Sequence, residues 1–336
     1  MASSHFLLTA ASGAIFGSAI TAAGVYSPSV IQGQMALTNF HMVKSFLAAS
    51  ACSALIVIGA NRSGYAKLSH RPDSSYGWFA KYDANIVGGM LQGIGMALTG
   101  ACPGTVLAQL ALGVGSAWMV APGCILAGVA FAKLGKHMKR TTENRATPGE
   151  KPHRQEQTVQ DKTGLSTTST VLLYELLCLV MITAATFLAP NGRHRHWLNP
   201  VAGGLLIGIA QATSVLFTRK TLGVSASYAD AGAYIWNVID PKANPRPGMS
   251  NIVFASGVMA GAKFISQFIP AAASETNPPV GALAAVLGGF VMVFGARTAG
   301  GCTSGHGLSG MATMGLSSFV TVASMFTGGI AMSLLL

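Results

Sequence analysis

The amino-acid sequence predicts an all-α, polytopic membrane protein, and three observations carry this prediction. Hydrophobic residues make up 51% of the 336 positions and charged residues only 9%, whereas a soluble domain of this size would carry charge at about 25% of its positions. The mean hydropathy is +0.50. Three long blocks, 1–43, 84–132 and 298–336, contain no Asp, Glu, Lys or Arg. A transmembrane helix needs about 20 mainly apolar residues, so the second block has room for two.

A repeated motif, GGx5Gx4GxC, divides the chain into two halves. Its first copy occupies 88–102 and its second copy occupies 288–302. The matching positions are Gly88 and Gly288, Gly89 and Gly289, Gly95 and Gly295, Gly100 and Gly300, and Cys102 and Cys302. This repetition predicts two half-molecules built on one plan, whose cysteines face each other inside the membrane.

Each half offers four apolar segments of transmembrane length or slightly less. In the first half these are 6–26, 42–60, 86–99 and 106–131; in the second they are a segment starting near 204, then 252–269, 280–294 and 308–335. Polar segments at 27–35 and 225–237 interrupt them, the first beginning with Ser27-Pro28. Irregular backbone at this depth is tolerated only where it is buried in protein or lines a cavity. We therefore expect short broken or re-entrant helices that converge at the centre.

One further apolar segment, 171–188, lies between the halves and brings the expected total to about nine transmembrane helices. An odd number of crossings before the second half turns that half upside down, which is the arrangement of two inverted repeats. The expected divisions are a first membrane repeat at 1–132, a linker at 133–168, an extra helix at 169–198 and a second membrane repeat at 199–336.

The charges lie mainly outside the apolar segments. Lys and Arg outnumber Asp and Glu by 21 to 10, and the linker is rich in basic residues, which predicts a solvated, cytosolic linker under the positive-inside rule. Basic loops of a membrane protein suit anionic lipid, so we do not expect a nucleic-acid partner. We expect an integral protein of the plasma or inner membrane.

The two repeated cysteines precede residues that favour a helix start. In Cys102-Pro103-Gly104-Thr105 the proline suits the first helical position, and in Cys302-Thr303-Ser304 the hydroxyls suit a helix N-cap. Helix starts bind anions through free backbone N–H groups. The predicted substrate-binding residues around these starts are Cys102, Gly100, Gly104 and Thr105 in the first half and Cys302, Gly300, Gly301, Thr303 and Ser304 in the second. Either cysteine could instead be an inert packing residue between helices.

Three more residues are candidates for the same site, each with a structural alternative. Arg297 could attract an anion, or it could extend to the membrane interface or pair with a carbonyl. His306 could take part in proton transfer, or it could be a packing histidine with its hydrogen bonds satisfied. Gln34 could line the pathway, or it could only satisfy the interrupted backbone.

At these residues the sequence resembles the YeeE/YedE family of sulfur-transport membrane proteins. The segments that carry the resemblance are GMALTGACPGT (95–105), GARTAGGCTSGHGLSG (295–310) and GAIFGSAITAAGVYSPSVIQGQM (13–35). The resemblance implies short helices converging on a central constriction, uptake of thiosulfate, and transfer of the ion between cysteines by transient S–H···S hydrogen bonds. It implies that Cys102 and Cys302 are relay positions. Bacterial members can have a further cysteine in the first broken segment, and here 27–35 has none.

The leading functional prediction is therefore a permease for thiosulfate or a related sulfur anion, and not an enzyme. One alternative is a membrane sulfurtransferase in which Cys302 carries a persulfide, activated by His306 as the nearby base. Another is a small-solute channel that the cysteines merely narrow. The sequence has no P-loop ending in GKS or GKT, no CxxC and no Cys/His metal pattern, so we expect no metal and no cofactor. A downstream sulfur-accepting protein is a possible partner.

Overall fold

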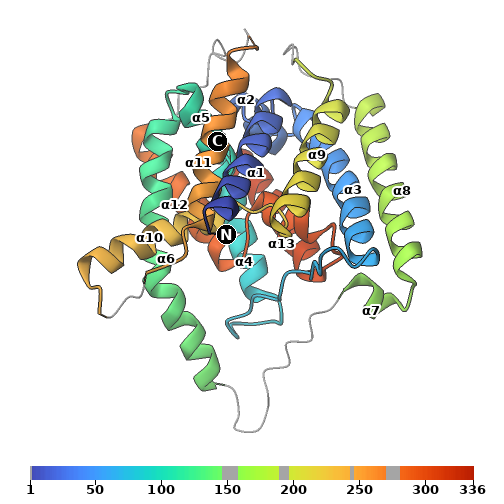
Figure 1. Cartoon of the computed structure of the whole chain (residues 1–336). Coiled ribbons are helices and arrows are strands. Elements are labelled where there is room, and N and C mark those ends of the chain that lie inside the picture. The colour runs from blue at the N-terminus through green and yellow to red at the C-terminus, as the bar shows by residue number, and fades with distance from the viewer. Residues whose placement is uncertain (1, 146–157, 189–196, 243–245, 270–280) are drawn as a thin grey trace.

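The computed structural model describes residues 2–145, 158–188, 197–242, 246–269 and 281–336. Every extended regular element in these ranges is a helix, and the helices form one bundle (Figure 1). The first half contains α1 (Ala2–Ala22), α2 (Pro28–Met35), α3 (His41–Arg62), α4 (Asp83–Thr99), α5 (Thr105–Leu112) and α6 (Ala117–Arg145). The rest contains α7 (Val159–Thr163), α8 (Thr167–Leu188), α9 (Pro200–Thr218), α10 (Ser225–Ile239), α11 (Ser250–Ser266), α12 (Ala282–Thr298), the π-helix η2 (Thr303–Gly310) and α13 (Leu316–Ser333).

Helix breaks follow glycine and proline. Helix α2 begins with Pro28 as its first residue, where the missing N–H costs no hydrogen bond. Helix α4 ends at Gly100, which takes a left-handed conformation with φ of 62°, the usual way for a glycine to end a helix. The two polar segments expected to be irregular, 27–35 and 225–237, are largely helical, as α2 and α10.

Helices α4 and α12, which carry the repeated motif, cross antiparallel at their glycines. A Cβ on Gly88 would lie 2.6 Å from the carbonyl oxygen of Gly295, and a Cβ on Gly295 would lie 2.6 Å from that of Gly88. At the other end of the crossing, a Cβ on Gly95 would meet the carbonyl oxygen of Gly288 at 2.5 Å. Glycines let two helix backbones approach this closely inside a membrane. The end of α4 lies beside Gly288, and the end of α12 lies beside Gly88.

Helices from the two halves pair with each other throughout the bundle. Helix α1 packs on α11 while α3 packs on α9, and α4 packs on α13 while α12 packs on α6. Helix α8 lies apart at the edge of the bundle and contacts α3 (Figure 1). Its leucines at 172, 173, 176 and 177 are more than half exposed, as expected for a helix whose outer face meets lipid.

Six of the described helices are long and apolar enough to cross a membrane, and the count reaches seven if α12 and η2, bent by 41°, form one broken span. The predicted total of nine is not confirmed. Helices α4, α11 and α12 have only 17 residues each. The spans expected at 106–131 and 308–335 are each interrupted, because α5 ends at Leu112 before α6 begins, and η2 ends at Gly310 before α13 begins.

The boundary expected at 132 does not coincide with a helix end. Helix α6 continues to Arg145, into the range assigned to the linker, and α7 lies near the end of that range. Part of the predicted linker, 146–157, lies outside the described residues.

Candidate functional site

Cys102 begins the turn that leads into α5, and its own motif supplies its hydrogen bonds. The Thr105 hydroxyl accepts a hydrogen bond from the Cys102 backbone N–H at 2.7 Å. The Thr105 backbone N–H donates to the Cys102 sulfur at 3.4 Å. The thiol therefore lies at a helix start, beside a backbone donor, as its spacing predicted. It is 9% exposed.

Cys302 occupies the equivalent place before η2, with more donors around it. Its sulfur lies 3.2 Å from the Ser304 hydroxyl oxygen. The backbone N–H of Gly305 and the backbone N–H and hydroxyl of Ser225, the first residue of α10, lie near the sulfur. Two helix starts, those of η2 and α10, thus meet at one thiol that is 1% exposed.

One small cavity joins the two cysteine turns. Its volume is about 60 Å³, enough for a few waters or one small ion. Cys102, Gly104 and Thr105 border it from the first half, and Thr303 and Ser304 border it from the second. The rest of its wall is apolar, supplied by Phe16, Ile20, Val25, Met42, Phe46, Ile207 and Leu308. Five of the predicted site residues therefore surround one space.

The carbonyl groups of Thr298, Ala299 and Gly300, where α12 ends, are bound by side chains from other segments. The last carbonyls of a helix have no partner within it and must find one outside. The Ser74 hydroxyl donates to the Thr298 carbonyl oxygen at 2.7 Å, and the Asn85 amide donates to that of Ala299 at 3.0 Å. The Arg71 guanidinium donates to the carbonyl oxygen of Gly300 at 3.3 Å. The connection between α12 and η2 is thereby held by the loop 63–82 and by α4.

Both ring nitrogens of His306 are engaged. Nε2 lies 3.1 Å from the Ala299 carbonyl oxygen, and Nδ1 lies 3.0 Å from the Ser318 hydroxyl. Because a carbonyl can only accept, the proton belongs on Nε2 and Nδ1 accepts from Ser318. The neutral ring fastens η2 to α12 and α13, and it presents no free nitrogen to Cys302.

Arg297 and Gln34 lie away from the cysteine cavity. The Arg297 guanidinium carbon lies 5.6 Å from the centre of the Phe131 ring, and its buried Nε has no hydrogen-bond partner among the described residues. Gln34 accepts a hydrogen bond from the Val43 backbone N–H at 3.1 Å. It borders a separate apolar cavity of about 660 Å³ that Tyr174 of α8 also lines. Neither side chain borders the cavity; Cys302 does not border it either, although the next two residues, Thr303 and Ser304, do.

The profile of the sulphur transport family matches residues 9–331. The chain belongs to the sulphur transport family.

Two curated relatives of this sulphur transport protein are each named "Probable transporter", from Xylella fastidiosa strains 9a5c and Temecula1 / ATCC 700964. Each is 26% identical over 140 residues, which cover 40% of this chain and 91% of the relative. The resemblance to a sulfur-transport family drawn from the cysteine motifs is thus confirmed, as are transport and membrane location in several apolar helices.

Three residues around the site of this family member escaped the sequence analysis. Gln92 donates to the Thr303 hydroxyl at 2.7 Å and is fully buried in α4. Ser225 reaches Cys302, and Arg71 reaches the turn that carries it. Gln92 is the one amide side chain inside the repeated motif, in the middle of an otherwise apolar stretch, and this pattern was a usable signal. Ser225 and Arg71 lie in polar stretches where nothing distinguishes them from their neighbours.

Proposed function

We propose that this protein is a permease for thiosulfate or a related sulfur anion, which passes between the Cys102 and Cys302 thiols. The observation that carries the proposal is the cavity bordered by the Cys102 turn and by the Thr303–Ser304 start of η2. A thiol combines a weak S–H donor with a soft, polarizable sulfur. A thiol at a helix start adds backbone donors, so a sulfur-bearing anion finds both kinds of contact at each station.

An inverted two-fold relation between the halves supports passage through the centre. The contacts of Gly88 with Gly295 and of Gly95 with Gly288 are reciprocal, as in a two-fold interface between equivalent helices. The equivalent helices run antiparallel, which fits repeats of opposite orientation with a site between them. The alignment with each "Probable transporter" relative covers 91% of the relative but only 40% of this chain. This fits a chain built from two units of that size.

The side of the membrane is inferred from the position of the linker. The Val159 backbone N–H, at the start of α7 after the linker, donates to the Met314 carbonyl oxygen at 2.9 Å. The next residue, Gly315, adjoins His70 and Arg71 of the loop 63–82. If the basic linker is cytosolic, the Arg71 side of the Cys302 turn faces the cytosol, where a sulfur-accepting protein could take the ion.

The engaged state of His306 favours a permease over a sulfurtransferase. A cysteine that attacks sulfane sulfur needs a base or another means of forming its thiolate. His306 was the base considered for Cys302, and its Nδ1 and Nε2 both have other partners. Non-covalent passage needs no such base.

The test is uptake of ³⁵S-labelled thiosulfate into proteoliposomes, with sulfate and sulfite as competitors. We expect Cys102→Ser and Cys302→Ser each to lower uptake by about tenfold or more, because a hydroxyl lacks the soft sulfur that matches the substrate. Cys52→Ser is the matched control, since Cys52 is half-buried in α3 and belongs to neither cysteine turn.

Three outcomes would count against the relay. Equal uptake by wild type, Cys102→Ser and Cys302→Ser would remove it and favour a simple pore. An equal loss in Cys52→Ser would show a general effect on folding. A persulfide on Cys302 detected by mass spectrometry after exposure to thiosulfate would point to the sulfurtransferase.

A further inference from the structure

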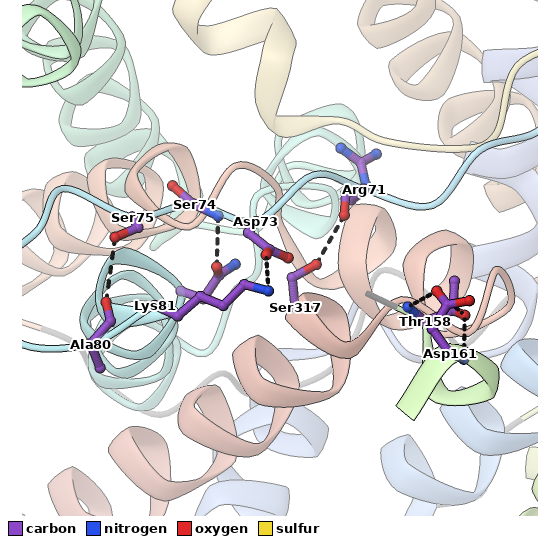
Figure 2. Close-up of polar contacts among 10 residues, drawn as sticks. Arg71, Asp73, Ser74, Ser75, Ala80, Lys81, Thr158, Asp161 and Ser317 are labelled. Carbon is purple, nitrogen blue, oxygen red and sulfur yellow. Dashed lines mark hydrogen bonds and ion pairs between the residues drawn. The ribbon is translucent and has the colours of Figure 1, made fainter. Parts of the chain in front are cut away.

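Arg71 extends from the loop between α3 and α4 to the turn that carries Cys302. Its Nε donates to the Gly305 carbonyl oxygen at 2.6 Å, and its Nη1 donates to that of Gly300 at 3.3 Å. Its own carbonyl oxygen accepts from the Ser317 hydroxyl at 3.0 Å. Figure 2 shows the guanidinium pointing away from Ser317, so the backbone is held on one side and the charge is presented on the other.

The loop around Arg71 is itself firmly held. Asp73 pairs with Lys81 at 3.3 Å, and the Ser74 backbone N–H donates to the Asn85 side chain at 2.8 Å (Figure 2). The Tyr76 backbone N–H donates to the Asp83 carboxylate at 2.8 Å. A side chain on a loop anchored at successive points is preorganised, which lowers the entropy cost of binding a ligand.

The positive charge of Arg71 is not neutralised by the described residues. Both partners of the guanidinium are carbonyl oxygens, and no Asp or Glu of the described ranges lies within ion-pair distance. Arg71 is half-buried, and its titratable neighbours are the Cys302 thiol and a second cation, Arg297. A cation taken partly out of water without a counter-ion is unfavourable, so an anion at this place would be stabilised.

Donors remain for such an anion. A guanidinium has five N–H groups, and Nη2 makes no hydrogen bond to the described residues. Nη2 lies between two glycines: it is 2.9 Å from where a Cβ on Gly223 would stand and 3.0 Å from one on Gly305. Larger residues at these positions would cover the guanidinium.

Gly223 also borders a pocket of about 50 Å³ with several polar lining residues. Lys220 and Thr221 of the same loop line the pocket, together with Ser250 and Asn251 at the start of α11. A second cation and further donors therefore lie one glycine away from Arg71, and the next residues along the chain lead to Ser225 and the Cys302 thiol.

We propose that Arg71 is the oxyanion-binding residue of the Cys302 station, holding the oxygens of the transported anion while its sulfur meets the thiol. The proposal rests on the permease function and adds the group that selects for an anion on the linker side. We do not assign oxyanion binding to Arg297, because its guanidinium lies against the Phe131 ring. Arginine suits the task since its planar donors match the oxygens of a tetrahedral oxyanion in pairs.

The first experiment measures binding in detergent from the thermal stabilisation that thiosulfate or sulfate gives, at constant ionic strength set with chloride. We expect Arg71→Gln to weaken binding of both oxyanions by about 10- to 100-fold, the factor for loss of a hydrogen bond to a charged group. Arg71→Lys keeps the charge and should lose less. Arg62→Gln is the control, because Arg62 lies at the end of α3 and bonds to Thr168 of α8.

Wild-type affinity in Arg71→Gln would overturn the proposal, as would an equal loss in Arg62→Gln, which would show a general effect of surface charge. A second measurement uses only the wild-type protein, so it does not depend on whether a variant folds. Thiosulfate or sulfate should slow modification of Arg71 by phenylglyoxal in the wild-type protein, read peptide by peptide, and should leave Arg62 unaffected. Unprotected modification of Arg71 would also overturn the proposal.

The two proposals fail in different ways. If wild-type proteoliposomes take up no sulfur anion while sulfate protects Arg71, the permease proposal fails and the anion site remains. If uptake depends on both cysteines but Arg71 is neither protected nor needed for affinity, the relay remains and Arg71 is only a tie between the loop and the Cys302 turn.

Discussion

Gly100 and Gly300 occupy the same position of the repeated motif, two residues before a cysteine, yet their carbonyl groups have different partners. The Gly100 carbonyl oxygen accepts from the Gln109 amide at 2.9 Å, and Gln109 belongs to α5, the helix that the turn itself begins. The Gly300 carbonyl oxygen accepts from Arg71, which comes from the loop between α3 and α4. The Gly100 carbonyl group is thus bound by a neutral side chain of the helix that follows it. The Gly300 carbonyl group is bound by a cationic side chain from a distant segment.

The same contrast extends to the cysteines. Cys102 is bonded within its own motif, by Thr105. Cys302 receives donors from Ser225 of α10 as well as from Ser304. The glycines common to both motifs determine how α4 and α12 cross. The two cysteine turns differ in the charge beside them and in how many contacts they receive from other segments. Under the proposed relay, an anion would bind more tightly at the Cys302 station than at the Cys102 station, while the direction of net transport would still follow its electrochemical gradient.

The crossing of α4 and α12 supports both turns, so breaking it should have the largest effect. Gly95→Val would place a side chain 2.5 Å from the Gly288 carbonyl oxygen and 2.6 Å from the Met292 backbone nitrogen. Because backbone cannot move aside, we expect a destabilisation of more than about 3 kcal/mol and loss of the monodisperse peak in size-exclusion chromatography. Gly59→Val in α3 is the control, because no atom lies within 4 Å of its Cβ position. A stable Gly95→Val protein would contradict the close crossing.

Variants that destabilise only the Cys302 turn or only the Cys102 turn would test whether the two turns are held independently. Asn85 is fully buried and binds the Ala299 carbonyl oxygen, the Thr321 hydroxyl and the Ser74 backbone N–H. We expect Asn85→Ala to cost about 2 kcal/mol in thermal unfolding and to speed alkylation of Cys302 while leaving that of Cys102 unchanged.

The reciprocal variant is Gln109→Ala, which removes the donor to the Gly100 carbonyl oxygen and to that of Tyr26. It should speed alkylation of Cys102 and leave Cys302 unchanged, as measured on separate peptides by mass spectrometry. Parallel changes at both cysteines in either variant would mean that the two turns move as one unit.

The smallest effect concerns α7, whose first residue, Val159, donates a hydrogen bond to the Met314 carbonyl oxygen just after η2. The Asp161 carboxylate accepts hydrogen bonds from the Thr158 backbone N–H and hydroxyl, and these lower its pKa. A group whose folded pKa is lowered adds stability above its unfolded pKa, and this stability is lost as the pH falls through the folded pKa. Amide exchange in α7 should therefore be faster at pH 3 than at pH 5 after correction for intrinsic rates.

Asp161→Asn should remove most of that pH dependence, and exchange in α5 should serve as the internal reference because α5 has no carboxylate. An unchanged pH profile in Asp161→Asn would show that another group controls the unfolding of α7.

Much of the fold could be predicted because its signals are local. The charge-free blocks indicate membrane helices, and Pro28 and Gly100 stand where helices begin and end. The interruption between α5 and α6 was missed although Gly113, which is left-handed with φ of 76°, gave a signal for it. An apolar run hides a short turn when the flanking residues remain hydrophobic.

The site was only partly predictable because its remaining partners are distant in the chain. Cys102, Thr105, Thr303 and Ser304 share one cavity, as their motif spacing predicted. The roles expected of Arg297, His306 and Gln34 stay predictions, although the structure places Arg297 and Gln34 away from that cavity. Arg71 stands more than two hundred positions before Gly300 and Gly305, and periodicity carries no information about contacts at that range.

By itself the sequence determined that the chain forms apolar helices, that two glycine-and-cysteine motifs repeat and each precede a helix start, and that the chain belongs with sulfur transporters. These properties depend on composition and on residues close together in the chain. Only the tertiary structure decided that a guanidinium from the first half closes the turn of the second, while the first turn stays neutral. The physical reason is that an unpaired charge is placed by the three-dimensional packing of loops against helix ends, where carbonyl groups without partners require a donor.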